Sequence, residues 1–201
     1  MRAVLRFIAA VMMTSGVLLI ADASVTLAWQ EPISALMAER QQDMLAADLT
    51  KPPARVLRRK PLKGDAIGKI ELPSINRSYF MVEGTDTGSL RKGPGHYPDT
   101  PLPGERGTVA IAGHRTTYGA PFRKIDKLRS GDKVVASMPF GRFVYRVERL
   151  DIVESTDLSV KRRVRYDRLI LTACHPLYSA AKRIVAFARF VRREPPTVGR
   201  G

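Results

Sequence analysis

The residue of this chain that is best suited to covalent chemistry is Cys174, the single cysteine among 201 residues. It follows the apolar segment 169–173, and Pro176 comes two residues later, so we expect the thiol at the end of a strand, on a rim. A small, buried, unreactive side chain is the alternative interpretation. An exposed thiol is open to oxidation, however, and a chain that keeps one needs it for a purpose. We therefore predict a nucleophile at this position.

Two further side chains are placed to assist that thiol. A thiol attacks as the thiolate, which needs a base or a cation beside it. Of the three histidines, His114 is the best placed base, because it ends another short apolar segment behind two small residues. His175 is adjacent to Cys174 and would point to the opposite face of a strand. Arg183 lies nine residues after the cysteine, which suits a hairpin that returns a guanidinium to the same end, where it can stabilise an oxyanion. A structural histidine and an exposed arginine are the alternatives.

Short apolar segments must supply the framework that brings these residues together. Alternating or continuous apolar residues predict strands over 67–73, 79–82, 108–112, 133–137, 143–153, 168–172 and 183–190. A short helix is expected over 121–128, and the segment 93–107 is so rich in glycine and proline that we expect no regular element there. Many short strands with few helices predict a mainly β fold that is a closed or nearly closed barrel.

The first 29 residues have the pattern of a membrane segment. The 23 residues 7–29 are apolar except for Asp22, with Arg2 and Arg6 before them and a tryptophan at the far end. About 20 helical residues cross the hydrocarbon core, so we predict a transmembrane anchor with a cytoplasmic N-terminus. The alternative is a cleaved signal peptide, because residues 21–23 have the small-x-small form of a cleavage site. Both interpretations export the rest of the chain and place the catalytic part outside the cell membrane.

A helix and a basic linker are expected between this anchor and the barrel. Apolar residues recur at helical spacing over 31–49, and we expect an amphipathic helix there. Its apolar positions are Ile33, Leu36, Met37, Met44, Leu45 and Leu49. Prolines at 52, 53 and 61 then begin an extended basic stretch. The predicted organisation is a cytoplasmic stub and anchor over 1–29, helix and linker over 30–65, a catalytic domain over 66–191 and a flexible tail over 192–201.

The charge of the chain limits the kinds of partner. Lys and Arg number 34 against 19 Asp and Glu, a formal charge of +15, with basic clusters within 51–63 and 161–168. Such a surface attracts nucleic acid, lipid headgroups or anionic cell-wall polymers alike. The clusters lack the interleaved aromatic residues that stack on bases, and an exported domain does not meet nucleic acid, so we expect no nucleic-acid partner. A non-catalytic, membrane-tethered module that binds anionic wall polymers is the alternative function. One cysteine and scattered histidines predict no metal site.

Three separated motifs resemble those of sortases. Residues 112–122, Ala-Gly-His-Arg-Thr-Thr-Tyr-Gly-Ala-Pro-Phe, are similar to the histidine motif of that family. Residues 171–176, Leu-Thr-Ala-Cys-His-Pro, followed by Arg-Ile-Val at 183–185, are similar to its cysteine and arginine motifs. Together with 93–104, the resemblance covers 66–191 and is greatest to class E sortases of high-GC Gram-positive bacteria. Ala173 stands where many members have threonine. L,D-transpeptidases, another class of thiol enzyme, carry Ser-His-Gly-Cys, whereas this chain has Ala-Cys-His-Pro.

The resemblance implies a closed eight-stranded sortase-type β-barrel and a cysteine transpeptidase without cofactor or metal. By the resemblance, Cys174 attacks the Thr–Gly bond of a C-terminal LAxTG or LPxTG sorting motif on a secreted protein. His114 would protonate the leaving amine and deprotonate the incoming one, an amine of peptidoglycan. Arg183 would bind the substrate backbone and the oxyanion. Further residues expected to bind the substrate are Thr172, Ala173, Tyr118 and His96.

Overall fold

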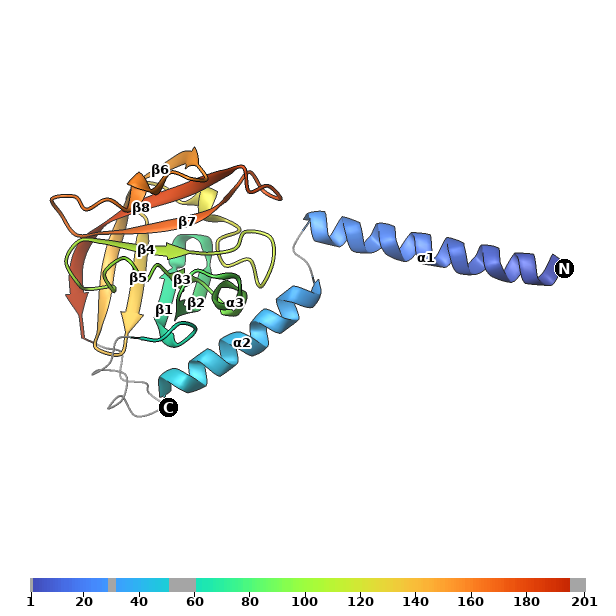
Figure 1. Ribbon diagram of the computed structural model, residues 1–201, viewed down its shortest axis with the longest axis horizontal. Coiled ribbons are helices and arrows are strands. Elements are labelled where there is room, and N and C mark those ends of the chain that lie inside the picture. Colours follow the sequence, from blue (N-terminus) through green and yellow to red (C-terminus); the bar gives the residue numbers. More distant parts are fainter. Residues whose placement is uncertain (1, 29–31, 51–60, 196–201) are drawn as a thin grey trace.

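The strands expected from the apolar segments close into one barrel in the computed structural model (Figure 1), which describes residues 2–28, 32–50 and 61–195. Neighbouring strands follow the order β1-β2-β3-β4-β7-β8-β6-β5. The bounds are β1 (Ala66–Leu72), β2 (Arg77–Glu83), β3 (Gly95–His96), β4 (Thr108–Ala112), β5 (Lys133–Met138), β6 (Gly141–Glu154), β7 (Arg168–His175) and β8 (Lys182–Glu194). Only the β2–β3 and β4–β7 pairs of the described barrel are parallel. The prediction of a mainly β, closed eight-stranded barrel is confirmed.

The two faces of β7 determine where its side chains point. Side chains alternate along a strand, and Leu169, Leu171 and Ala173 belong to the main core inside the barrel. Ile170 belongs instead to a second buried cluster on the outer face, with Val185 of β8. Both faces are therefore covered, which explains why the sequence of this strand is continuously apolar. The alternation continues to residue 174, whose side chain lies on the outer face.

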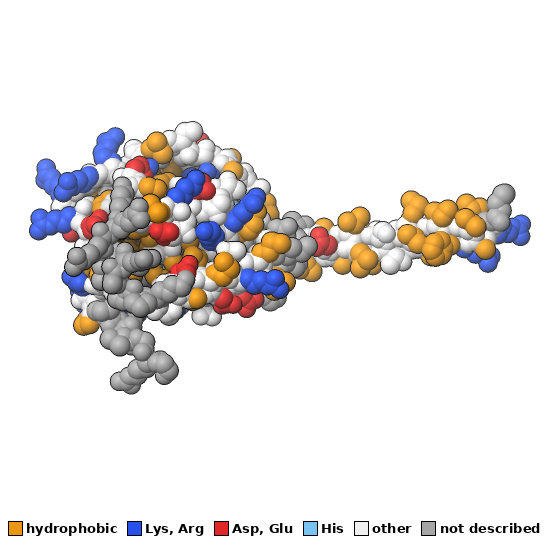
Figure 2. All heavy atoms as spheres, turned by 60° about the horizontal axis from the view of Figure 1, so that its bottom comes forward, with side chains coloured by type: hydrophobic (Ala, Val, Ile, Leu, Met, Phe, Trp, Pro, Cys, Tyr) orange, Lys and Arg blue, Asp and Glu red, His pale blue; other side chains and the backbone are white. Residues whose placement is uncertain are grey.

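The helices lie outside the barrel (Figure 1). They are α1 (Arg2–Ala28), α2 (Pro32–Thr50) and α3 (Thr87–Lys92), with 3-10 turns at Pro73–Ile75, Ile125–Lys127 and Leu158–Lys161. Within α1, the 24 residues of Arg2–Val25 have a mean hydropathy of 2.1 and are long and apolar enough to cross a membrane. Figure 2 shows apolar side chains along α1, basic ones at its far end and acidic ones near the globular part.

Helix α2 packs on the barrel with only part of the face that its apolar pattern suggests: of the predicted apolar positions, Leu45 is buried. Ser34, Ala38 and Leu45 are buried against the barrel side. The predicted apolar positions Leu36 and Met37 are more than half exposed, at 57% and 59%, as is Met44. Small side chains allow a helix backbone to approach its neighbour closely, and this decides which face docks. Leu36, Met37 and Met44 are consequently left pointing outward.

Local differences from the expected elements have local causes. The segment 93–107 contains the two-residue strand β3, because Gly95 allows close approach to Gly84: an added Cβ would lie 2.1 Å from the carbonyl oxygen of Gly84. The helix expected over 121–128 is only the 3-10 turn Ile125–Lys127. Within the flexible tail expected over 192–201, residues 192–194 instead continue β8 and pair with β6; residues 196–201 lie outside the described part.

Candidate active site

Three neighbouring strands bring the predicted catalytic residues to one end of the barrel. In the parallel pair of β4 and β7, Ala112 is opposite Thr172, and the amide of Gly113 donates to the carbonyl of Thr172 at 3.0 Å. Parallel strands end at the same edge of a sheet, so His114 and Cys174 leave it side by side. The hairpin expected from the nine-residue spacing is present between β7 and β8. The register of that hairpin places Arg183 directly opposite Cys174.

The thiol of Cys174 has a guanidinium as its nearest polar partner. Nη1 of Arg183 lies 3.4 Å from Sγ of the half-buried Cys174. The same nitrogen also donates to the backbone carbonyls of Ala180 and Lys182, at 3.4 and 3.3 Å, which hold the side chain over the thiol. A fixed guanidinium beside a sulfur stabilises negative charge on the sulfur or on an oxyanion formed next to it.

The imidazole of His114 is half-buried and has an available nitrogen. Its Nε2 is buried and has no hydrogen-bond partner among the described residues. The ring packs against Tyr118, with centroids 5.1 Å apart and planes at 54°. Burial, and to a lesser extent the positive charge of Arg91, lowers the pKa of His114 below 6.5, so the neutral ring predominates near pH 7. An uncommitted neutral nitrogen on this rim can accept a proton from a reacting group.

A small groove of about 30 Å³ lies beside Arg183 on the outer face of the sheet. Its floor comes from β7 and β8, and its wall from the connection between β6 and β7. The lining residues are Tyr97, Val153, Ser155, Asp157, Leu158, Val160, Lys161, Thr172, Arg183 and Val185. Lys161 fixes this wall by an ion pair with Asp99, at 2.6 Å, and by lying 4.8 Å from the ring centroid of Tyr97. Its volume is far below the roughly 300 Å³ at which ligand pockets begin, so the groove has space for one small group.

The four residues expected to bind substrate have different surroundings. Thr172 lies on the groove floor and shares a hydrogen bond of 3.3 Å with the hydroxyl of Tyr97, while Tyr118 packs on the imidazole. Ala173 is only 3% exposed and faces the barrel core, as its position in the alternation of β7 requires.

His96 is 2% exposed, and both of its ring nitrogens are engaged. They lie 2.8 Å from a carboxylate oxygen of Glu83 and 2.9 Å from the carbonyl of Pro101. The side chains of Ala173 and His96 are therefore almost entirely enclosed, and their part in substrate binding stays a prediction.

Arg115 is a site residue whose part the sequence did not reveal. It is only 4% exposed, and its guanidinium donates to the carbonyls of Cys174 and Arg123, each at 3.3 Å. It also forms an ion pair with Asp126 at 2.9 Å, and its Nη1 lies 3.4 Å from Nδ1 of His175. The guanidinium thus joins the end of the cysteine strand to the loop that follows the histidine. A buried partner eleven residues away is not visible in a sequence in which arginine is common.

No group of three or more His, Cys, Asp or Glu side chains among the described residues is placed to hold a metal ion.

Comparison with known proteins gives one consistent family. A family model described as the sortase domain matches residues 70–191. Sortase D of Bacillus subtilis is 37% identical over 136 residues, covering 66% of this chain and 67% of that protein. Sortase SrtE1 of Streptomyces coelicolor is 27% identical over 217 aligned positions, 97% of this chain but 59% of the relative. The solved sortase E of Streptomyces avermitilis is similar with a TM-score of 0.62 at 31% identity, covering 70% of this chain and 97% of that one.

Proposed function

The chain belongs to the sortase family, whose members are cysteine transpeptidases, and from this premise we propose its reaction, substrates and location. It cleaves a C-terminal sorting motif of LAxTG or LPxTG form between Thr and Gly. It then transfers the acyl group to an amine of peptidoglycan. The observation that carries the proposal is the guanidinium of Arg183 held 3.4 Å from the thiol of Cys174, at the strand end beside His114.

The first half of the reaction forms a thioester. The neutral imidazole of His114 takes the proton of the Cys174 thiol, and Sγ attacks the threonine carbonyl carbon. The C–S bond forms, and the carbonyl oxygen becomes an oxyanion next to the guanidinium of Arg183. The C–N bond to glycine then breaks, and the imidazolium of His114 gives its proton to the leaving amine. In the second half the acceptor amine attacks the thioester, passes its proton to the imidazole, which is neutral again, and releases the thiolate. The imidazolium returns this proton to the thiolate, so atoms and charge balance over the two halves.

The small groove on the outer face marks a place for one group of the substrate. It lies on β7 and β8 beside Arg183, with Thr172 and Val185 in its floor. A substrate anchored there would have its scissile carbonyl near the thiol and the guanidinium. The wall of the groove, fixed by Lys161 and Asp99, would contact the anchored group.

The apolar helix α1 supports a location at the cell membrane. We propose that α1 spans the membrane once and that the barrel works on the outer side. Three residues separate α1 from α2, and a chain extends at most about 3.6 Å per residue, so α2 must begin near the membrane surface. The outward Leu36, Met37 and Met44 of α2 suit such an interface. Secreted substrates would meet the enzyme there in two dimensions.

The test uses the full chain in lipid nanodiscs with fluorescent LAxTG and LPxTG peptides and a diaminopimelate amine. We expect a transpeptidation product and a thioacyl adduct on Cys174 by mass spectrometry, both lost in Cys174→Ala. Arg106→Ala, which changes an exposed arginine elsewhere, should keep full activity. Absence of product and adduct with every peptide would refute the proposal. Binding of wall polymer that persists in Cys174→Ala and disappears in high salt would instead favour a non-catalytic basic module.

A further inference from the structure

We propose that helix α2 is a positioning element for the imidazole of His114, acting through Ser34 and the loop 115–120. The proposal rests on the transpeptidase function proposed above, because that function gives the imidazole its task. It makes the segment between the apolar helix and the barrel part of the active-site support.

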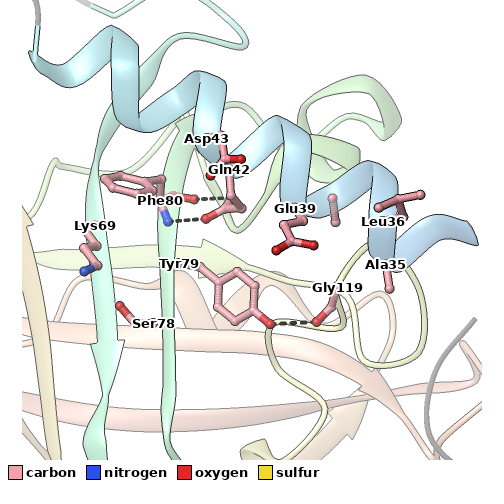
Figure 3. A pocket seen from close by; sticks show the side chains of 11 residues that line it. Ala35, Leu36, Glu39, Gln42, Asp43, Lys69, Ser78, Tyr79, Phe80 and Gly119 are labelled. Atoms are coloured by element: carbon pink, nitrogen blue, oxygen red, sulfur yellow. Dashed lines mark hydrogen bonds between the residues drawn. The ribbon is translucent and has the colours of Figure 1, made fainter. Parts of the chain in front are cut away.

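Helix α2 is fixed to the barrel by specific hydrogen bonds as well as by packing. Gln42 acts as a strand partner for β2: its Oε1 accepts the amide hydrogen of Phe80 at 2.6 Å, and its Nε2 donates to the carbonyl of Phe80 at 3.1 Å (Figure 3). The same Nε2 donates to the carbonyl of Lys92 at the end of α3, at 2.8 Å. These bonds set both the register and the rotation of α2 on the barrel.

The preceding two turns of α2 contact the loop that follows His114. Oγ of the buried Ser34 accepts the amide hydrogen of Tyr118 at 3.1 Å. Ala38 lies so close to Gly119 that a Cβ added there would be 3.1 Å from the Cβ of Ala38. On the barrel side, the hydroxyl of Tyr79 donates to the carbonyl of Gly119 at 2.7 Å (Figure 3). The loop is therefore held between α2 and β2.

The conformation of this loop needs such support. Tyr118, Gly119 and Ala120 all have positive φ, at 51°, 74° and 42°. Residues with a side chain rarely adopt this region, and they keep it only where the surroundings hold them. Because three consecutive residues have positive φ, the position of Tyr118 depends on the groups that form hydrogen bonds and packing contacts with the loop. The Ser34 hydroxyl holds the amide of Tyr118 itself.

The loop carries this constraint to the imidazole. The ring of Tyr118 lies against His114 with centroids 5.1 Å apart, and Arg91 of α3 lies 5.5 Å from the Tyr118 ring centroid. Together they enclose a ring whose Nε2 has no partner among the described residues. If the loop becomes more mobile, the imidazole can change its orientation and becomes more exposed to water. A proton-transfer group that is out of place by even a fraction of an ångström slows the chemical step more than it weakens substrate binding.

Activity measurements on the full chain in nanodiscs give the first test. We expect Ser34→Ala to lower kcat about tenfold with KM within about twofold, because only the positioning of the imidazole changes. Ser34→Thr keeps the accepting oxygen and should recover most of the loss. Ser130→Ala removes an equivalent hydroxyl from an exposed turn and should have no effect. Ala38→Leu, which forces α2 away from Gly119, should lower kcat further than Ser34→Ala does.

Titration of the His114 ring by NMR gives a second test that needs no substrate. The titratable and charged groups around the ring are Arg91 on α3, Tyr118 on the loop, and Cys174 and Arg183 on β7 and β8. Burial holds the pKa of His114 down, so loosening the loop in Ala38→Leu should raise it toward 6.5.

The two tests separate failure of the positioning role from failure of the proposed function. Unchanged kcat and an unchanged His114 titration in both α2 variants would overturn the positioning role. A wild-type chain without transpeptidation would refute the proposed function, and the titration would still decide whether α2 positions the ring.

Discussion

We expect substitution of the buried Arg115 to lower the stability of the protein strongly, because its guanidinium has several partners. Arg115→Met keeps most of the apolar stem and removes the charge. It breaks the 2.9 Å ion pair with Asp126 and leaves the carbonyls of Cys174 and Arg123 without this donor. Removing one partner of a fully buried pair costs about 3–5 kcal/mol. Asp126 is 37% exposed and can turn to water, so we expect a loss near the lower limit, about 3 kcal/mol.

A double-mutant cycle can measure how much of this loss in the free energy of unfolding comes from the interaction between Arg115 and Asp126. Urea unfolding, followed by near-ultraviolet circular dichroism, is measured for Arg115→Met, Asp126→Ala and the double variant. We expect a coupling free energy of about 1.5 kcal/mol, because the two side chains are in direct contact. Arg106→Met, at an exposed position, serves as the control and should change the free energy of unfolding by less than about 0.5 kcal/mol.

Activity provides the second readout for this pair. Arg115 holds the backbone of Cys174 itself, so kcat of Arg115→Met should fall about tenfold under conditions where the protein is still folded. A coupling free energy near zero, together with a loss no larger than that of the exposed control, would refute the assignment of Arg115 as the link between the two strand ends.

Four other substitutions test separate parts of the structure. Gly104→Ala would place a Cβ 2.2 Å from the ring of the buried Phe143 at a φ of +96°, and should cost about 3 kcal/mol in urea unfolding. Gly131→Ala, at a φ of +90° with open space around it, should cost only about 1 kcal/mol, and equal losses would contradict the packing argument. Burial lowers the pKa of His114 below 6.5 in the folded protein, so the contribution of the neutral ring to stability is complete above pH 6.5 and is lost as the pH falls through the folded-state pKa. His114→Gln should lack this decrease when the free energy of unfolding is measured against pH. An identical pH slope in the variant and the wild type would show that the ring is not buried in solution. Arg183→Lys keeps the charge but loses the planar fork over the thiol, and kcat should fall about a hundredfold with the fold intact; full turnover would show that a single positive charge is enough.

The barrel was largely predictable because its strands follow simple patterns. Period-two alternation identified β1 and β2, and continuous apolar runs identified β4 and β7, which are covered on both faces. The family resemblance then gave the number of strands and the end of the barrel at which to look for chemistry. What the patterns could not give was β3, whose two residues pair only because Gly95 approaches Gly84. The six-residue helix α3 was also missed, since it depends on the cap formed by Asp86.

The site was predictable only as far as local spacing reaches. The nine residues between Cys174 and Arg183 fix their opposition through one hairpin. The periodicity of α2, by contrast, shows that one face is apolar but not which face meets the barrel, and small residues at Ser34 and Ala38 decided that. The burial of Arg115 likewise depends on Asp126, which no periodicity marks.

The pairing of β4 with β7 has a consequence for when the site exists. Cys174 and Arg183 meet across a hairpin, a contact that closes a short loop and can form early. His114 is 60 residues from the cysteine and reaches it through the parallel pairing of β4 with β7, which closes a much longer loop than the hairpin does. A chain in which β4 has not paired with β7 therefore has a guanidinium beside its thiol but no base. Arg115 ties the two strand ends together and α2 holds the loop behind the histidine, so the complete arrangement depends on long-range contacts. The thiol gains its proton-transfer partner only when β4 has paired with β7.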